Sequence, residues 1–475
     1  MQPLTRAALE RERPVPRRPP RVLQVGEGNF IRAFVDWMIH RMNRRGVFDG
    51  SVVLTPARAQ GREKIAGLQA QDGLFTVWLA GPDRGRIVDA PEIVESVQAC
   101  ADPFTDWEGF LALAEAADLD VVVSNTTEVG LAYEPVPYPA DAAPPGYPAR
   151  LAAYLYRRYR AFAGAPERGV VVLPCELVPE NGRRLRTAVL AHAADWGLED
   201  GFARWITDHT VFADTLVDRI VTGFPADAPA RFAQLGYSDR FLTVAEPFHL
   251  WAVAAPEAVR ERLPFDRAGL NVVFADDIAP YWTRKLYVLN GTHTFLAPLG
   301  LLAGHRTVRA AVEDPRLGPV VDRVVRALTI PYGFAAAEHQ AVTAYWEEVA
   351  ARFRNPFVDH ALSAITANHF AKVRLRLGPV AEAFRARTGR EPRVLAASLA
   401  AALALTRPGA PPGFDPAVRE AVAPRWTETA DRETAVGRIL ADFGLAWTAD
   451  WVAAVAAALA AYDRGGWPAL LAGAD

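Results

Sequence analysis

Up to about residue 275, short apolar runs alternate with stretches of helical periodicity. Five runs of five or six residues are rich in β-branched residues and are bounded by polar or turn-forming residues. They predict strands at residues 21–25, 51–55, 120–125, 169–174 and 270–274. A helix is predicted at residues 31–43, and residues 216–220 are predicted to close another helix. Continuously apolar strands between helices indicate a parallel, doubly wound sheet with both faces buried, and therefore an α/β domain.

Farther along the chain the pattern becomes helical. Long alanine- and leucine-rich stretches, such as residues 393–405 and 450–462, replace the strand-like runs. We therefore predict that the α/β domain covers residues 21–277 and that residues 278–475 form a second, mostly α-helical domain.

The composition argues against several classes of protein. The chain has 475 residues, 51% of them apolar and 23% charged, which suits large cores in two or three domains. A formal net charge of −3 argues against a nucleic-acid partner, and no apolar stretch is long enough to indicate a membrane span. Residues 1–20 are rich in arginine and proline and lack the apolar segment of a signal peptide, so they are predicted to form a flexible tail.

The cysteines and histidines indicate neither disulfides nor a metal site. Cys100 and Cys175 lie far apart, and the nine histidines show no metal-ligand spacing. We therefore expect no metal, and a cytoplasmic location fits the few cysteines.

A glycine-containing turn follows the first predicted strand. Gly26 and Gly28 lie between the strand and the helix, as in a loop that binds the pyrophosphate of a dinucleotide. Ile31 replaces the third glycine of the usual pattern, so an ordinary strand-to-helix turn is the alternative. The candidate cofactor residues of this segment are Gly26, Gly28, Asn29, Phe30 and Arg32.

Two other strand ends carry candidate cofactor contacts. The second strand ends without the acid that usually holds the adenine ribose, and Arg58 follows it. Arg58 could accept a 2′-phosphate or stack on adenine, so the choice between NAD and NADP stays open. Asn125 and Thr126 end the strand at 120–125, where they could contact the ligand or cap the next turn.

The segment 285–293 combines an amine, an amide and an imidazole. At helical spacing, Lys285, Asn290 and His293 can project toward one pocket. A lysine can transfer a proton, an asparagine can donate to an oxygen that gains negative charge, and a histidine can hold a hydroxyl. This set suits reversible reduction of a ketone, and the alternative is a helix with three unrelated polar residues.

Together these motifs resemble the polyol-specific long-chain dehydrogenase/reductase family, which includes the mannitol dehydrogenases. The matching residues are Gly26, Gly28, Phe30, Arg32 and Ala33 in the first motif, and Lys285, Asn290 and His293 in the second. The resemblance implies a Rossmann-type N-terminal domain, a helical C-terminal domain, a nicotinamide cofactor and no catalytic metal.

Within the family, the tagaturonate reductase branch is the most similar. The similar segments are residues 24–30, 32–37, 124–128, 174–177 and 355–357. This implies interconversion of D-tagaturonate and D-altronate with a nicotinamide cofactor, usually NAD. We expect the protein to be a monomer or a small homo-oligomer. The alternatives are a fructuronate reductase, a mannitol 2-dehydrogenase and a non-catalytic sensor of nucleotides or sugars.

The resemblance also implies roles for individual residues. Lys285 would act as general acid and base, Asn290 would stabilise the oxyanion, and His293 would orient the substrate. Asp218 would orient the substrate or tune Lys285, although a salt bridge with a neighbouring arginine is the alternative. Mannitol dehydrogenases carry a second asparagine where this chain has Leu177, so we expect Asn290 to be the single amide donor, or a replacement donor from elsewhere in the chain.

A sugar-acid substrate needs a cation for its carboxylate. The candidates are Lys372, Arg374, Arg376 and His360. The alternating spacing of the three cations would bring them together in an extended or loosely helical segment, and a solvated basic edge is the alternative.

Overall fold

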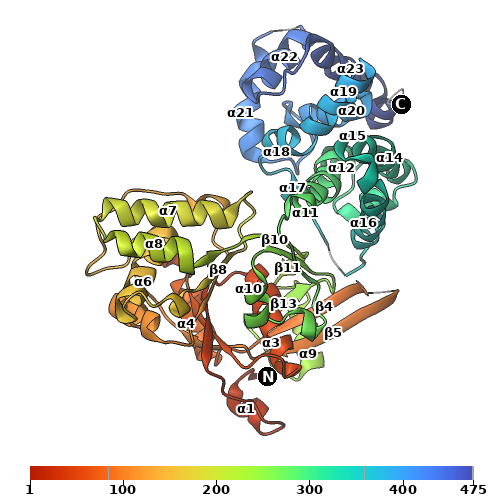
Figure 1. The fold of residues 1–475 in the computed structure, drawn as a ribbon. Coiled ribbons are helices and arrows are strands. Elements are labelled where there is room, and N and C mark those ends of the chain that lie inside the picture. Colours follow the sequence, from red (N-terminus) through yellow and green to blue (C-terminus); the bar gives the residue numbers. More distant parts are fainter. Residues whose placement is uncertain (84, 358, 430, 473–475) are drawn as a thin grey trace. The chain divides into compact units, whose positions relative to one another are not determined.

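The computed structural model describes residues 1–83, 85–357, 359–429 and 431–472. The chain divides into two compact units, Met1–Tyr281 and Trp282–Asp475. The predicted boundary lay at residue 277. Figure 1 shows strands and helices in the first unit and helices in the second.

The first unit is built around a six-stranded parallel sheet in the order β6-β3-β2-β7-β8-β9. Its strands are β2 (Pro20–Val25), β3 (Ser51–Thr55), β6 (Val97–Cys100), β7 (Val121–Ser124), β8 (Val171–Pro174) and β9 (Val211–Phe212). Four of the five predicted strands therefore form the centre of this sheet. The prediction of a Rossmann-type α/β domain followed by a helical domain is confirmed.

Both faces of the sheet are buried, which explains the continuously apolar strands. Along β7, Val121 and Val123 belong to one hydrophobic cluster, and Val122 belongs to another on the opposite face. Successive side chains of a strand point to opposite faces, so each strand contributes to both clusters.

Helices connect the strands of the sheet (Figure 1). They are α2 (Asn29–Ile31), the π-helical η1 (Arg32–Asp36), α3 (Trp37–Arg44), α4 (Arg62–Ala70), α5 (Trp107–Ala112), α6 (Tyr147–Ala161), α7 (Asn181–Asp195) and α8 (Asp200–His209). The predicted helix at 31–43 corresponds to α2, η1 and α3, which follow one another without a break.

Besides a two-stranded sheet formed by β1 (Gln2–Pro3) and β12 (Tyr237–Ser238), the first unit contains two smaller sheets of four and three strands. One has the order β11-β13-β4-β5 and the other the order β10-β14-β15. Their strands are β4 (Phe75–Asp83), β5 (Arg86–Val94), β10 (Asp214–Asp218), β11 (Val221–Gly223), β13 (Thr243–Ala245), β14 (Leu250–Ala254) and β15 (Val272–Phe274). The prediction of a helix end at 216–220 is wrong, because residues 214–218 pair as a strand with β14. The predicted strand at 270–274 is β15, which lies outside the central sheet.

Residues 1–20 are ordered, in contrast to the predicted flexible tail. Gln2–Pro3 pairs with Tyr237–Ser238, and a short helix follows at Arg6–Glu10. Leu4, Leu9 and Val15 are buried together with Leu74. The guanidinium of Arg6 donates to Val15 O at 3.1 Å and its backbone N–H donates to Asp72 at 2.9 Å. Three apolar side chains, spaced among the arginines and prolines, therefore anchor the segment.

The second unit is helical and has one extended hydrophobic core. Its longer helices are α12 (Gly291–Leu302), α14 (Leu317–Val324), α16 (His339–Phe353), α18 (His369–Arg376), α19 (Gly378–Thr388), α20 (Arg393–Thr406), α21 (Pro416–Thr427), α22 (Arg432–Asp442) and α23 (Ala449–Leu471). Helix α20 packs against both α12 and α23. Its residues from Leu395 to Thr406 are all buried, and its many alanines allow neighbouring helices to approach closely.

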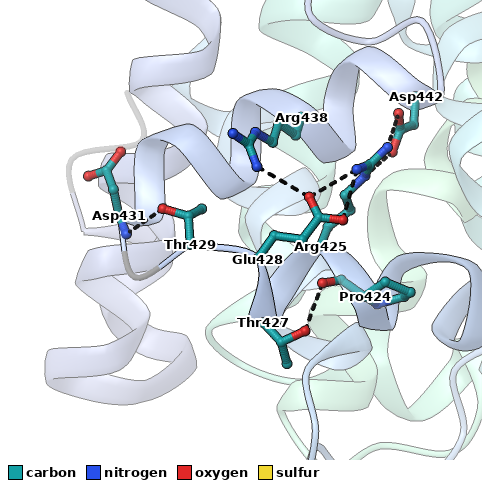
Figure 2. A network of polar contacts seen from close by, with 8 residues as sticks. All are labelled: Pro424, Arg425, Thr427, Glu428, Thr429, Asp431, Arg438 and Asp442. Carbon is teal, nitrogen blue, oxygen red and sulfur yellow. Dashed lines mark hydrogen bonds and ion pairs between the residues drawn. The ribbon is translucent and has the colours of Figure 1, made fainter.

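A surface network ties α21 to α22 (Figure 2). Arg425 pairs with Glu428 at 2.9 Å and with Asp442 at 2.7 Å, and Arg438 pairs with Glu428 at 3.3 Å. Exposed ion pairs contribute little to stability, and here one arginine, Arg425, links two carboxylates across the two helices.

Among the helices of the described residues, none combines the length and the apolar character that a bilayer crossing requires.

Candidate functional site

In the first unit, the order of the strands reverses between β2 and β7. The chain runs from β2 outward through β3 to β6 on one side, and from β7 through β8 to β9 on the other. Ligands of open α/β sheets bind at the carboxyl ends of the strands beside such a reversal. Gly26 follows the last residue of β2 there, and Asn125 N donates to Val25 O at 2.9 Å.

Gly26 and Gly28 meet different requirements of the glycine turn. Gly26 has φ +124°, and a Cβ there would lie 2.6 Å from Asn125 O, so no other residue fits. A Cβ on Gly28 would meet nothing within 4 Å, so space is open beside this residue. Gly28 also begins the helix without a side-chain cap, which leaves the first backbone N–H groups available to an anion. The turn therefore fits a dinucleotide pyrophosphate.

Arg32, a predicted cofactor contact, is a buried anchor in the structure. It is 2% exposed, and its guanidinium donates to Phe241 O and to Asn29 Oδ1, both at 2.6 Å. It also lies over the rings of Phe75 and Phe241. Burial lowers the pKa of Arg32 to about 10. The Arg32 side chain therefore holds the glycine turn against Phe241 and against Phe75 of β4, and the side chain of Asn29 helps to hold the guanidinium in place. Phe30 stacks on Phe34, with 5.0 Å between ring centroids.

Arg58 is exposed and donates to Thr127 Oγ1 at 3.1 Å, so it links the ends of β3 and β7. The carboxylate of Glu27, from the glycine turn, accepts a hydrogen bond from Ala57 N at 3.2 Å. A carboxylate and a guanidinium therefore both lie at the end of β3, where the adenine ribose of a dinucleotide is expected.

Asn125 and Thr126 belong to a network centred on Glu176. This buried carboxylate accepts hydrogen bonds from Ser124 Oγ at 3.0 Å, Thr126 N at 2.8 Å and Thr126 Oγ1 at 2.9 Å. The amide of Asn125 donates to Cys175 O at 3.3 Å. Burial raises the pKa of Glu176, and these hydrogen bonds oppose the rise. The network fixes the ends of β7 and β8 at the expected ligand edge.

Asp36 is a buried acid beneath the glycine turn, and the sequence patterns did not single it out. Gln24 Nε2 donates to Asp36 Oδ2 at 3.1 Å and to Gly26 O at 3.2 Å. Neither Asp36 Oδ1 nor Gln24 Oε1 has a hydrogen-bond partner in the part of the chain that the structure describes. Burial raises the pKa of Asp36 to about 8, although Gln24 and Arg32 oppose the rise.

Asp218 ends β10 and is buried. The neighbouring Arg219 donates to Glu246 O at 2.8 Å and to Ala33 O, and it lies over the ring of Trp37. The guanidinium of Arg219 is thus held by backbone carbonyls.

The loop after β8 carries Leu177, whose side chain cannot supply the second amide donor considered for this position. The amide nearest in sequence is that of Asn181, whose Nδ2 donates to Pro174 O, Glu176 O and Thr215 O, each at 3.0 Å. Because this amide is committed to the backbone, it does not replace the missing donor.

In the second unit, Lys285 and Asn290 are the first and last residues of a π-helical segment, η7 (Lys285–Asn290). It lies between α11 (Ala279–Arg284) and α12. A π-helix bonds each N–H to the fifth preceding carbonyl, so residues five apart lie one turn apart on the same side. The α-helical spacing used for the prediction separates the same two residues by a wide angle. The π segment therefore aligns Lys285 with Asn290 better than the sequence pattern indicated.

His293 follows at the start of α12 and is 5% exposed. Its ring stacks on Phe353 with 4.4 Å between centroids and meets the edge of His360 at 4.7 Å. Burial, followed by the charges of His360 and nearby cations, lowers the pKa of His293 well below its usual value, so the ring is neutral. Asn290 Nδ2 and His293 Nε2 are buried without a hydrogen-bond partner among the described residues. Such atoms are costly unless a ligand satisfies them.

The predicted cations divide between two faces of α18. Lys372 and Arg376 are one helical turn apart, and the charges of both act on His293. Arg376 donates to Thr294 Oγ1 at 3.2 Å, and Lys372 donates to Ile365 O at 3.0 Å. Arg374 is exposed and lies beside Gly444. The expectation that the cations gather in an extended or loosely helical segment is wrong, because regular helical geometry turns Arg374 away.

Two further observations concern the groups around His293 and the amine of Lys285. The buried Arg352 also acts electrostatically on His293. The chain contains only three lysines, Lys64, Lys285 and Lys372, among 52 basic residues. Arginine supplies almost all the other basic residues, and a lysine amine differs from a guanidinium in that it can release its proton.

Among the described residues, no group of three or more His, Cys, Asp or Glu side chains is arranged to hold a metal ion.

Residues 20–267 match the family described as mannitol dehydrogenase Rossmann domain, and residues 277–458 match the mannitol dehydrogenase C-terminal domain. An altronate oxidoreductase from Halalkalibacterium halodurans is 43% identical over 384 residues, which cover 81% of this chain and 74% of that protein. An altronate oxidoreductase from Bacillus subtilis is 37% identical over 434 residues, 91% of this chain and 89% of that protein.

The fold is similar to that of a mannitol 2-dehydrogenase from Pseudomonas fluorescens, solved as a ternary complex with NAD and D-mannitol. The TM-score is 0.77 with 22% identity, and the match covers 99% of each chain.

Proposed function

The chain belongs to the mannitol dehydrogenase family, and from this we propose that it is an NAD-dependent reductase that interconverts D-tagaturonate and D-altronate. One observation carries the proposal of catalysis: buried Asn290 Nδ2 and His293 Nε2 lack partners among the described residues and lie on the same stretch of chain as a rare lysine. Without a polar ligand, Asn290 Nδ2 and His293 Nε2 would stay buried without hydrogen bonds, which would destabilise the folded protein. Relatives named altronate oxidoreductase support the choice of substrate.

The dinucleotide would bind at the carboxyl edge of the central sheet, with Gly26 and Gly28 beside its pyrophosphate. The carboxylate of Glu27, which reaches from the glycine turn to the end of β3, favours NAD, because a carboxylate accepts a ribose hydroxyl and repels a 2′-phosphate. Arg58 would lie over the adenine. The enzyme would work in the cytoplasm on a small sugar acid.

When bound, the reduced nicotinamide supplies a hydride to the ketone carbon. The Lys285 ammonium gives its proton to the oxygen as the C=O bond becomes C–O–H, and in the reverse direction the neutral amine accepts that proton. Asn290 Nδ2 donates to the same oxygen as it gains negative charge. His293 orients the oxygen through its neutral ring. Asp218 remains a candidate for orienting substrate hydroxyls.

Arg376 is our candidate for binding the substrate carboxylate; Lys372 and His360, which like Arg376 act electrostatically on His293, are the other candidates. We expect Arg376→Gln to raise KM for tagaturonate roughly 10- to 100-fold, because a charge-assisted hydrogen bond to the substrate is lost. KM for NADH should stay unchanged. Steady-state kinetics would measure both constants.

Arg374→Gln provides the matched control, since Arg374 lies on the same helix but is exposed. It should leave KM for tagaturonate within about twofold of the wild-type value, as surface substitutions usually have small effects. Equal effects of the two substitutions would contradict the assignment of Arg376.

A substrate panel tests the proposed function directly. NADH consumption should show the highest kcat/KM with D-tagaturonate, and lower values with D-fructuronate and D-fructose. Preference for fructuronate or fructose would reassign the substrate within the family. No turnover with any of the three, while NADH still binds, would point to a sensor.

A further inference from the structure

A polar cavity of about 210 Å³ lies in the first unit, between the N-terminal segment, α3 and the end of β5. The residues that give it its chemistry are Arg13, Arg18, His40, Arg44 and Glu95. Pockets for drug-sized molecules have volumes of about 300–1,000 Å³, so this cavity suits a smaller ligand.

Charges around the cavity are unbalanced. Arg13 pairs with Glu95, the one acid of the lining, and Arg18 pairs with the exposed Asp49 outside it. Arg44 has no ion-pair partner among the described residues. The lining therefore carries three guanidinium groups against one carboxylate.

His40 adds a neutral donor to this positive site. Its Nδ1 accepts a hydrogen bond from Glu95 N at 3.4 Å, so the ring proton lies on Nε2. Nε2 has no hydrogen-bond partner in the described part of the chain, and the ring lines the cavity. Burial is the main cause that lowers the pKa of His40 to about 3, and four surrounding arginines add to it. The arginine charges thus converge on this ring.

We propose that this cavity is a binding site for a small dianionic oxyanion of the phosphate type. Arg18 and Arg44 would neutralise its charge, and His40 Nε2–H would donate to one of its oxygens. Arginine is suited to this ligand because its donors form a planar fork that matches two phosphate oxygens.

The N-terminal segment would have a function in this site, because it supplies Arg13 and Arg18 to the lining of the cavity. Buried Leu9 and Val15 hold the segment in place, and its arginines then form one wall of the cavity. The site is separate from the glycine turn, because it involves the C-terminal end of α3, whereas the turn precedes α2. It does not depend on the substrate or cofactor proposed above.

Isothermal titration calorimetry of the full-length protein with inorganic phosphate, in a chloride-matched buffer of constant ionic strength, tests the site. We expect saturable binding that Arg44→Gln weakens roughly 10- to 100-fold. Arg18→Gln should act in the same direction. A parallel titration with glycerol 3-phosphate identifies the source of the group: tighter binding than phosphate indicates a phosphorylated metabolite, and equal or weaker binding indicates the free ion.

Arg45→Gln is the matched control, because Arg45 is the neighbour of Arg44 and is exposed like it, but only Arg44 lines the cavity. It should bind phosphate like the wild type. Absence of saturable binding, or equal loss in the Arg44 and Arg45 variants, would overturn the proposal. NADH turnover without phosphate should be the same in all variants, which separates this test from that of the proposed reaction.

Discussion

Replacement of Lys285 by alanine is expected to lower kcat for tagaturonate reduction roughly 1,000-fold, within the range found for loss of a general acid. Lys285→Arg should be nearly as slow. Arginine keeps the positive charge but does not release a proton at any physiological pH, so it separates proton transfer from simple charge stabilisation. The Kd for NADH, measured by fluorescence titration, should stay close to the wild-type value in both variants, because the proposed cofactor residues lie in the first unit.

Lys64→Ala is the control for loss of an amine. Lys64 is the one lysine besides Lys285 and Lys372, and it is exposed on α4. Its kcat should match that of the wild type. A Lys285→Arg enzyme with more than about a tenth of the wild-type kcat would mean that charge, and not proton transfer, is what Lys285 provides.

The central sheet and the glycine turn could be predicted because local sequence determines both. A strand buried on two faces needs a continuous apolar run, and the turn after β2 needs a glycine at φ +124°. β4 and β13 could not be placed in the same way. β13 has only three residues, too few for a recognisable apolar run, and its parallel partner β4 lies far away in sequence.

The assignment of individual cations failed for a related reason. Sequence shows that Arg32 follows the glycine turn, but not that its guanidinium enters the interior to meet Phe241 O. Likewise, Lys372 and Arg374 are close in sequence, and only the helical geometry of α18 separates them. The position of a charged residue near a motif therefore predicts the location of its charge poorly, because its long side chain can turn toward solvent or toward the core. The spacing of the motif itself is a better predictor of structure.

The N-terminal segment illustrates how composition can mislead. Its arginines and prolines are typical of a flexible tail, but Leu4 and Leu9 are almost completely buried. A few apolar side chains that find a complementary surface can offset the ordering entropy of a short segment.

Asp36 yields a prediction about stability, because its proton is held differently in the folded and unfolded states. The folded pKa is about 8, above the unfolded value near 3.8. Between these values the folded protein keeps a proton that the unfolded chain has released. Stability from this group is therefore complete below about pH 4 and is lost as the pH rises toward 8.

Asp36→Asn should remove that loss, since asparagine is neutral at every pH and can accept from Gln24 Nε2 as the protonated acid does. We expect the free energy of unfolding of the variant, relative to that of the wild type, to increase by on the order of 3 to 4 kcal/mol when the pH is raised from 5 to 8. Urea unfolding of both proteins at the two pH values, followed by circular dichroism, would measure it. Asp83→Asn, an exposed carboxylate at the end of β4, should show no such dependence on pH. If the two variants behaved alike, Asp36 would have to be ionised in the folded protein, and its buried charge would need a partner other than Gln24.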